Sequence, residues 1–162
     1  MATKTQLEVL VCGMTDADMP GVVKIARASY DNPPSEDDFL DSLRRHNRLG
    51  YVAKTQKRGI SGYVLLEGTR RSFHILDLAV HPDDRRSGVG LAIVQTLVQR
   101  MTATGRKKIV AEVRDRNLPA HLFFKSCGFR AVEVYREYCI GPNDELEDAY
   151  VFQWPGDLEP AS

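Results

Sequence analysis

The spacing of apolar residues along the chain switches between two periods, and each switch marks a predicted element. Short apolar, β-branched runs predict strands at residues 7–14, 49–55, 59–68, 72–81, 107–115, 130–140 and 147–154. Apolar residues three and four positions apart predict helices at residues 16–30, 35–45, 88–104 and 117–129. The order β-α-α-β-β-β-α-β-α-β-β predicts a mixed α/β sheet covered by helices.

Capping residues define the ends of several predicted helices. Asp16 is a candidate N-cap for the first helix, and Ser35 precedes Asp38 by three residues, as in a capping box. Asn117 is placed to cap the last helix, and Gly128 is placed to end it. These boundaries follow from local chemistry alone.

The overall composition is that of an ordinary globular protein, with 43% hydrophobic and 27% charged residues. A length of 162 residues predicts a single domain over residues 1–162. Lys plus Arg equals Asp plus Glu at 22 each, so no net field favours nucleic acid or an anionic membrane. No uncharged apolar run reaches the roughly 18 residues that a membrane span requires.

Cysteine and histidine spacing suggests neither a disulfide framework nor a metal site. Cys12, Cys127 and Cys139 are odd in number and far apart, and the four histidines have no metal-ligand spacing with them. The N-terminal stretch lacks the long apolar core of a signal peptide. We therefore expect a cytoplasmic protein without a bound metal.

The stretch "RRSGVG" at residues 85–90 follows an apolar strand and begins a predicted helix. Free amides and the helix dipole make such a start suitable for an anion. Gly88 and Gly90 would leave the backbone open, and Arg85 and Arg86 would add cationic donors. The alternative is that the glycines only ease helix packing. The stretch matches neither the P-loop nor the three-glycine dinucleotide fingerprint, which disfavours nucleotide hydrolysis and NAD chemistry.

Two separate blocks resemble a known family. "LAVHPDDRRSGVGLAIVQTL" resembles the acyl-CoA binding motif of the GNAT superfamily of N-acyltransferases, and "AEVRDRNLPAHLFFKSCGF" resembles the following segment of N-terminal acetyltransferases that act on ribosomal proteins. The resemblance extends over nearly the whole chain. It implies a GNAT-type fold, a mixed, mostly antiparallel central sheet of about seven strands flanked by about four helices. It also implies acetyl-CoA as the cosubstrate, with no metal.

The same resemblance assigns roles to individual residues. The backbone of Leu78, Ala79 and Val80, on a strand that splays from its neighbour, would bind the pantetheine arm and the thioester carbonyl. The pyrophosphate would lie against Arg85, Arg86, Ser87, Gly88, Val89 and Gly90, and Asn117 is a further cofactor-binding candidate. Glu112 matches the general base, with a solvated strand glutamate as the alternative. Alternation along the strand at residues 107–115 independently predicts that Glu112 points away from the face of Ile109, Ala111 and Val113. An α-amine has a reference pKa of about 7.7–8.0 against about 10.4 for lysine, so a modest base favours an N-terminal acceptor.

Phe124 is the main departure from the family pattern. Resembling enzymes carry a tyrosine there that can protonate the departing thiolate, and phenylalanine has no proton to donate. Tyr138, Cys127 or water could replace that acid. Tyr138 also falls where related enzymes contact the substrate N-terminus, with a strand aromatic packed on a neighbour as the alternative. Cys139 stands where a second tyrosine is often found.

The favoured function is acetyl transfer from acetyl-CoA to a protein or peptide N-terminal α-amine, with ribosomal proteins as the acceptors that the resemblance suggests. One alternative keeps the cosubstrate and uses a small-molecule amine, such as an antibiotic or a polyamine, as the acceptor. The other is a CoA-binding or partner-binding module with little turnover, for which Phe124 is the argument. We expect no nucleic-acid or membrane partner, and a monomer or a weak homodimer.

Overall fold

The computed structural model describes residues 8–141 and 143–156. The helices are α1 (Met19–Ser29), α2 (Glu36–Arg44), α3 (Val89–Ala103) and α4 (Leu118–Ser126). The strands are β1 (Leu10–Gly13), β2 (Arg48–Thr55), β3 (Gly59–Gly68), β4 (Ser72–Val80), β5 (Lys108–Arg114), β6 (Arg130–Ile140) and β7 (Leu146–Trp154). This order confirms the predicted sequence of elements. Leu7, the predicted start of the first strand, lies outside the described residues.

The seven strands form one sheet in the order β1-β2-β3-β4-β5-β7-β6. Every neighbouring pair is antiparallel except β4 and β5, which are parallel. The parallel pair needs a crossover, which α3 supplies. The expected mixed, mostly antiparallel sheet with four helices is therefore confirmed.

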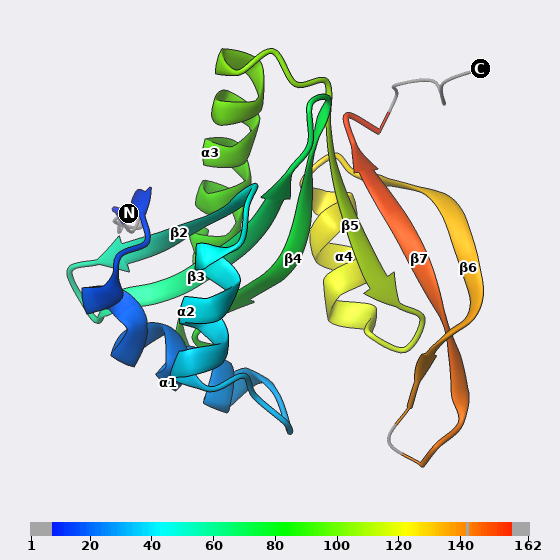
Figure 1. Ribbon diagram of the computed structural model, residues 1–162, viewed down its shortest axis with the longest axis horizontal. Helices are drawn as coiled ribbons and strands as arrows, with labels where there is room; N and C mark the ends of the chain where they lie inside the picture. Colours follow the sequence, from blue (N-terminus) through cyan, green and yellow to red (C-terminus); the bar gives the residue numbers. More distant parts are fainter. Residues whose placement is uncertain (1–7, 142, 157–162) are drawn as a thin grey trace, which may run out of the picture.

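Two apolar clusters pack on opposite faces of the sheet, because successive strand residues point to opposite sides. Val64 and Leu66 of β3 pack with α3 and α4, whereas Tyr63 and Leu65 of the same strand pack with α1 and α2. Figure 1 shows α1 and α2 next to each other against the β2–β4 part of the sheet. The face covered by α1 and α2 is the one that also carries the hollows described below.

The first helix begins later than predicted. Asp16 opens a short 3₁₀ turn (Asp16–Asp18), and α1 starts at Met19. Thr15 and Asp18 form the capping box instead, with the Thr15 N–H donating to Asp18 Oδ2 at 2.8 Å. Asp16 was therefore the wrong N-cap, since this reciprocal pair takes the amides that it would have bonded. The predicted caps at Ser35 and Asn117 are confirmed.

Candidate functional site

The parallel strands β4 and β5 separate partway along their length. Their pairing runs from Ser72 with Lys108 to Ile75 with Ala111 and stops there. Figure 1 shows the two strands side by side at one end and running apart towards their carboxyl ends. The predicted backbone ligands Leu78, Ala79 and Val80 therefore lie on the unpaired edge of this fork.

A bulge in β4 lies where the fork opens. Leu65 pairs with Asp77 and Leu66 with Ile75, so Leu76 is an extra residue on β4. A bulge of this kind bends a strand and re-aims its side chains. Leu76 consequently projects between two hollows on the same face and lines both of them.

The loop that follows β4 holds two left-handed residues before α3 begins. Arg86 has φ 64° and Gly88, the N-cap, has φ 94°. The Ala92 N–H donates to the Gly88 carbonyl at 3.0 Å, so the amides of residues 89–91 precede the helix's own hydrogen-bond ladder. Figure 1 places this helix start at the open end of the fork. The arrangement offers free amides to an anion.

The two glycines of this loop have different surroundings. A Cβ atom at Gly88 would have no heavy atom within 4 Å, whereas one at Gly90 would lie 2.8 Å from Cε2 of Phe123. Gly90 thus allows α3 to approach α4, which is the packing alternative raised by the sequence. Val89 between them is buried in the core at 1% exposure.

Three other predicted cofactor-binding side chains have partners within the protein. Arg85 Nε donates to the Val80 carbonyl at 3.3 Å. The Ser87 hydroxyl donates to the Asp84 carbonyl, and Asn117 Oδ1 accepts the Ala120 N–H at 3.3 Å, as a helix cap. An anion at α3 would therefore meet backbone amides first, and Arg85 would have to turn from Val80 to reach it.

Glu112 is the first β5 residue beyond the paired part of the fork. Ile109, Ala111 and Val113 are buried, whereas Glu112 is exposed on the opposite face, as its alternation predicted. It lines a cleft of about 430 Å³ together with Arg114, Tyr138 and residues of β4, β6 and β7. The negative charge of Glu112 raises the pKa of Tyr138, and a hydrogen bond between the two side chains raises it further. The fold thus brings the predicted base and the predicted tyrosine together.

An irregularity in β6 carries Tyr138 to this position. The register between β6 and β7 shifts between Tyr135 and Cys139, and Glu137 has φ 52°. Asp148 of β7 accepts the Glu137 N–H at 2.8 Å and a guanidinium N–H of Arg136 at 2.9 Å. The Asp148 carboxylate therefore holds the bulge that presents Tyr138. The Tyr138 ring also lies 5.1 Å from that of Tyr135, which is the packing alternative.

Phe124 lies in the apolar core. Only 6% of it is exposed, and its ring lies 5.0–6.0 Å from those of Phe123, Phe129 and Phe152. Cys127, at the end of the same helix, is half-buried, and burial raises the pKa of its thiol. The structure therefore places Phe124 as a packing residue and Cys127 as a poor thiolate.

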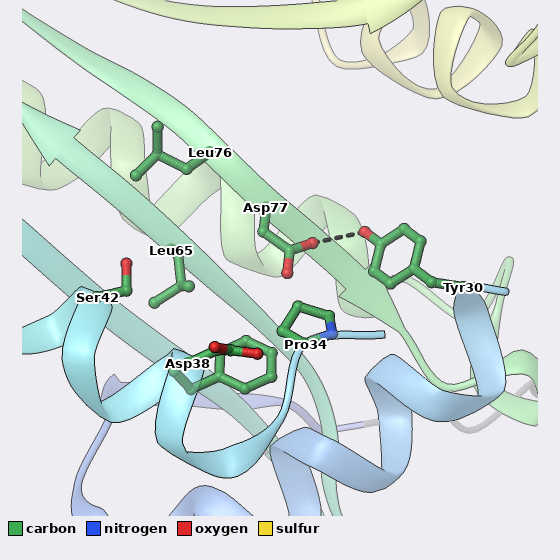
Figure 2. Close-up of a pocket in the computed structure, with 8 residues that line it drawn as sticks. Tyr30, Pro34, Asp38, Ser42, Leu65, Leu76 and Asp77 are labelled. Carbon is green, nitrogen blue, oxygen red and sulfur yellow. Dashed lines mark hydrogen bonds between the residues drawn. The ribbon is translucent and has the colours of Figure 1, made fainter. Parts of the chain in front are cut away.

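A second hollow of about 470 Å³ lies across Leu76 from the Glu112 cleft. Asp77 accepts the hydroxyls of Tyr30 at 2.5 Å and of the fully buried Tyr63 at 2.7 Å. Figure 2 shows the Tyr30 ring and the Asp77 carboxylate pointing toward each other. Burial raises the pKa of Asp77, although the two hydroxyls partly oppose this. Sequence reasoning missed Asp77. The signal that could have revealed it is its position as the single acidic residue within the apolar run "HILDLAV".

The described residues include no candidate membrane span and no candidate metal site. No helix within residues 8–141 and 143–156 is long and apolar enough to cross a membrane. Over the same residues, no group of three His, Cys, Asp or Glu side chains could hold a metal ion.

Known acetyltransferases are similar to this chain in sequence and in fold. The chain is 24% identical over 145 residues to the ribosomal protein bS18-alanine N-acetyltransferase of Escherichia coli K12, covering 90% of this chain and 96% of that protein. It is 27% identical over 154 residues to an N-alpha-acetyltransferase of Sulfurisphaera tokodaii, covering 88% and 89%. The crystal structure of the Escherichia coli ribosomal-protein-S18-alanine enzyme matches with a TM-score of 0.80 at 21% identity, over 94% of this chain and 97% of that one.

The family comparison covers the helices and the fork. The "Acetyltransferase (GNAT) family" matches residues 19–129, from the start of α1 to the residue after the Gly128 turn. This range contains the β4–β5 fork, the loop before α3, Glu112 and α4. The chain is therefore a member of the GNAT family, an N-acetyltransferase.

Proposed function

We propose that this chain, as a single acetyltransferase domain over residues 1–162, transfers an acetyl group from acetyl-CoA to the N-terminal α-amine of a cytoplasmic protein or peptide. Ribosomal proteins are the favoured acceptors. The observation that carries the proposal is the position of Glu112, which faces a cleft shared with Tyr138 directly beyond the last β4–β5 pair. The names of the two relatives at 24% and 27% identity support the choice of acceptor.

The donor end of the site consists mainly of backbone. In this proposal the amides at the start of α3 and the side chains of Arg85 and Arg86 bind the pyrophosphate. The unpaired edge of β4 at residues 78–80 binds the pantetheine arm and donates to the thioester carbonyl. Such donors stabilise the oxyanion of the tetrahedral intermediate, because they are already oriented towards it.

The acceptor end supplies the proton transfer. The neutral amine attacks the thioester carbon, Glu112 takes the amine proton directly or through a water molecule, and the intermediate collapses to the amide and the CoA thiolate. A thiol of reference pKa about 8.5 is a fair leaving group near neutrality, so the lack of a hydroxyl at Phe124 does not block this step. Among the described residues that line the Glu112 cleft, Tyr138 alone carries a hydroxyl, and we assign it to acceptor contact.

Thiol release from acetyl-CoA tests the acceptor. We expect release with short peptides bearing a free α-amine, and little release with Nα-blocked lysine peptides or with polyamines and aminoglycosides. Release with small amines alone would make the α-amine assignment wrong. Binding of acetyl-CoA without release across the whole panel would identify a binding module. Intact masses of ribosomal proteins from cells with and without the gene then identify the acceptor.

A pair of variants tests the base. Glu112→Gln should lower turnover and change the shape of the pH–rate profile, because glutamine cannot accept the proton and deprotonation of the free amine alone then sets the rise of rate with pH. Glu133→Gln is the matched control, since Glu133 is also an exposed strand glutamate but lies on β6 outside the cleft. An unchanged pH–rate profile in Glu112→Gln would remove Glu112 from the mechanism.

A further inference from the structure

Arg58, in the turn between β2 and β3, joins that turn to the segment that connects β4 with α3. Its Nε donates to Asp84 Oδ2 at 2.7 Å, and its Nη2 donates to Asp83 Oδ2 at 3.2 Å. Its Nη1 lies 3.4 Å from His81 Nε2. One guanidinium thus contacts three residues of a segment that lies more than twenty positions further along the chain.

Asp84 depends on this contact because it is almost completely buried, with 3% of the residue exposed. Its other cation, the Lys57 ammonium, lies 3.9 Å away and is mostly exposed. Burial raises the pKa of Asp84, but hydrogen bonds from Arg58 and Ser61 and the charges of Arg58 and Lys57 outweigh burial and lower it overall. A buried carboxylate without its partner is strongly unfavourable, so Arg58, at 2.7 Å the closest cation, is the main partner that holds Asp84 in place.

Asp84 in turn supports the loop before α3 through its backbone. Its carbonyl accepts the Ser87 hydroxyl, and its N–H donates to the His81 carbonyl at 2.9 Å. Ser87 is flanked by the left-handed residues Arg86 and Gly88. A side chain at φ 64° is sterically disfavoured, so the loop needs such contacts to keep this shape.

We propose that Arg58 is a positioning residue which, through Asp84, holds residues 85–90 in the shape that receives the CoA pyrophosphate. This inference rests on the proposed function, which assigns the pyrophosphate to that loop. Arg58 itself is not assigned to the ligand, because all three of its polar contacts are with the loop segment.

The test compares two acyl donors, acetyl-CoA and S-acetyl-pantetheine, which carries the same thioester and no phosphate. If Arg58→Ala leaves the loop in its binding shape about one-tenth of the time, kcat/KM for acetyl-CoA falls about tenfold, while that for S-acetyl-pantetheine changes less than about twofold. Arg58→Lys keeps a charge beside Asp84 but loses the forked contact, and should show a smaller loss in the same direction. If Arg58→Ala does not fold, Arg58→Lys still allows the two acyl donors to be compared.

Arg106→Ala is the matched control. Arg106 likewise bonds a distant turn, with its Nε donating to the Thr69 carbonyl at 2.8 Å, and its guanidinium lies 4.5 Å over the Phe73 ring, away from the loop before α3. The ratio of kcat/KM for acetyl-CoA to that for S-acetyl-pantetheine should not change in this variant.

Equal losses with both donors in the Arg58 variants would overturn the inference, because Arg58 would then support the domain in general. No loss with either donor would overturn it as well. A wild-type protein that uses both donors equally well would refute the pyrophosphate assignment itself, and the role of Arg58 with it.

Discussion

Adding a methyl group at Gly90 tests whether this glycine serves helix packing. The new Cβ would lie 2.8 Å from Cε2 and 3.0 Å from Cζ of Phe123, so the ring would have to move. Overpacking of this kind costs about 1–3 kcal/mol. Replacing glycine with alanine in a helix returns up to about 1 kcal/mol. We expect Gly90→Ala to lose about 0–3 kcal/mol of unfolding free energy.

The same change at Gly88 has a different physical origin. Gly88 has φ 94°, and nothing would lie within 4 Å of its Cβ. The left-handed backbone alone costs an L-residue about 1–2 kcal/mol. Because the two single variants have overlapping expected losses, stability alone does not separate the two causes.

Combining each variant with Phe123→Leu separates the clash at Gly90 from the backbone strain at Gly88. A smaller side chain relieves the clash at Gly90, so Gly90→Ala in that background should be about 1 kcal/mol less costly than in the wild type. Gly88→Ala should cost the same in both backgrounds to within about 0.5 kcal/mol.

Denaturant unfolding of the six proteins measures both coupling energies. A Gly90–Phe123 coupling of zero would refute the packing explanation, because it would mean that the ring moves away freely. A Gly88 coupling as large as that of Gly90 would refute the claim that the two glycines have separate roles.

Three further predictions concern Tyr138, Phe124 and Asp77. Glu112→Gln should lower the pKa of Tyr138, since the charge and hydrogen bond of Glu112 raise it. Absorbance titration of tyrosinate measures this pKa, with the same variant carrying Tyr138→Phe as the reference. An unchanged pKa of Tyr138 would contradict the contact. Phe124→Tyr should lose about 1–3 kcal/mol of unfolding free energy and should not raise turnover, because residue 124 is only 6% exposed and its ring lies among three phenylalanines. A tenfold higher turnover would show instead that this position reaches the leaving thiol. Asp77 has a raised pKa in the folded state. The wild type should therefore gain stability relative to Asp77→Asn as the pH falls through this raised pKa towards 3.8, the ordinary value for aspartate. Unfolding midpoints of the two proteins that fall in parallel as the pH is lowered would contradict this.

Features that depend on a few neighbouring residues could be read from the sequence. The capping box of Ser35 and Asp38, the Asn117 cap and the outward direction of Glu112 are all confirmed. Asp16 failed as a cap because a competing pair, Thr15 and Asp18, satisfies the same amides. Local chemistry therefore defines elements well and their exact first residue less well.

Two residues that sequence reasoning missed, Asp77 and Arg58, both depend on distant partners. Asp77 binds tyrosines 47 and 14 positions away, and Arg58 binds an aspartate 26 positions away. No period or capping pattern encodes such pairs, because they form only once the strand register is set. The resemblance suggested residues 85–90 as the pyrophosphate site, but it gave no sign of the contact between Arg58 and Asp84.

The sequence by itself determined the order of helices and strands and the side of β5 on which Glu112 lies, since both follow from periods of two or about four residues. The family resemblance came from two motif blocks of the sequence, one around residues 85–90 and one from Glu112 to Phe129. Only the tertiary structure decided that β4 and β5 part after Ile75 and Ala111, that Leu76 bulges between two hollows, and that Tyr138 meets Glu112. These features depend on which strands pair and where the pairing stops. Pairing is a balance of packing over the whole sheet, and no single stretch of residues contains it.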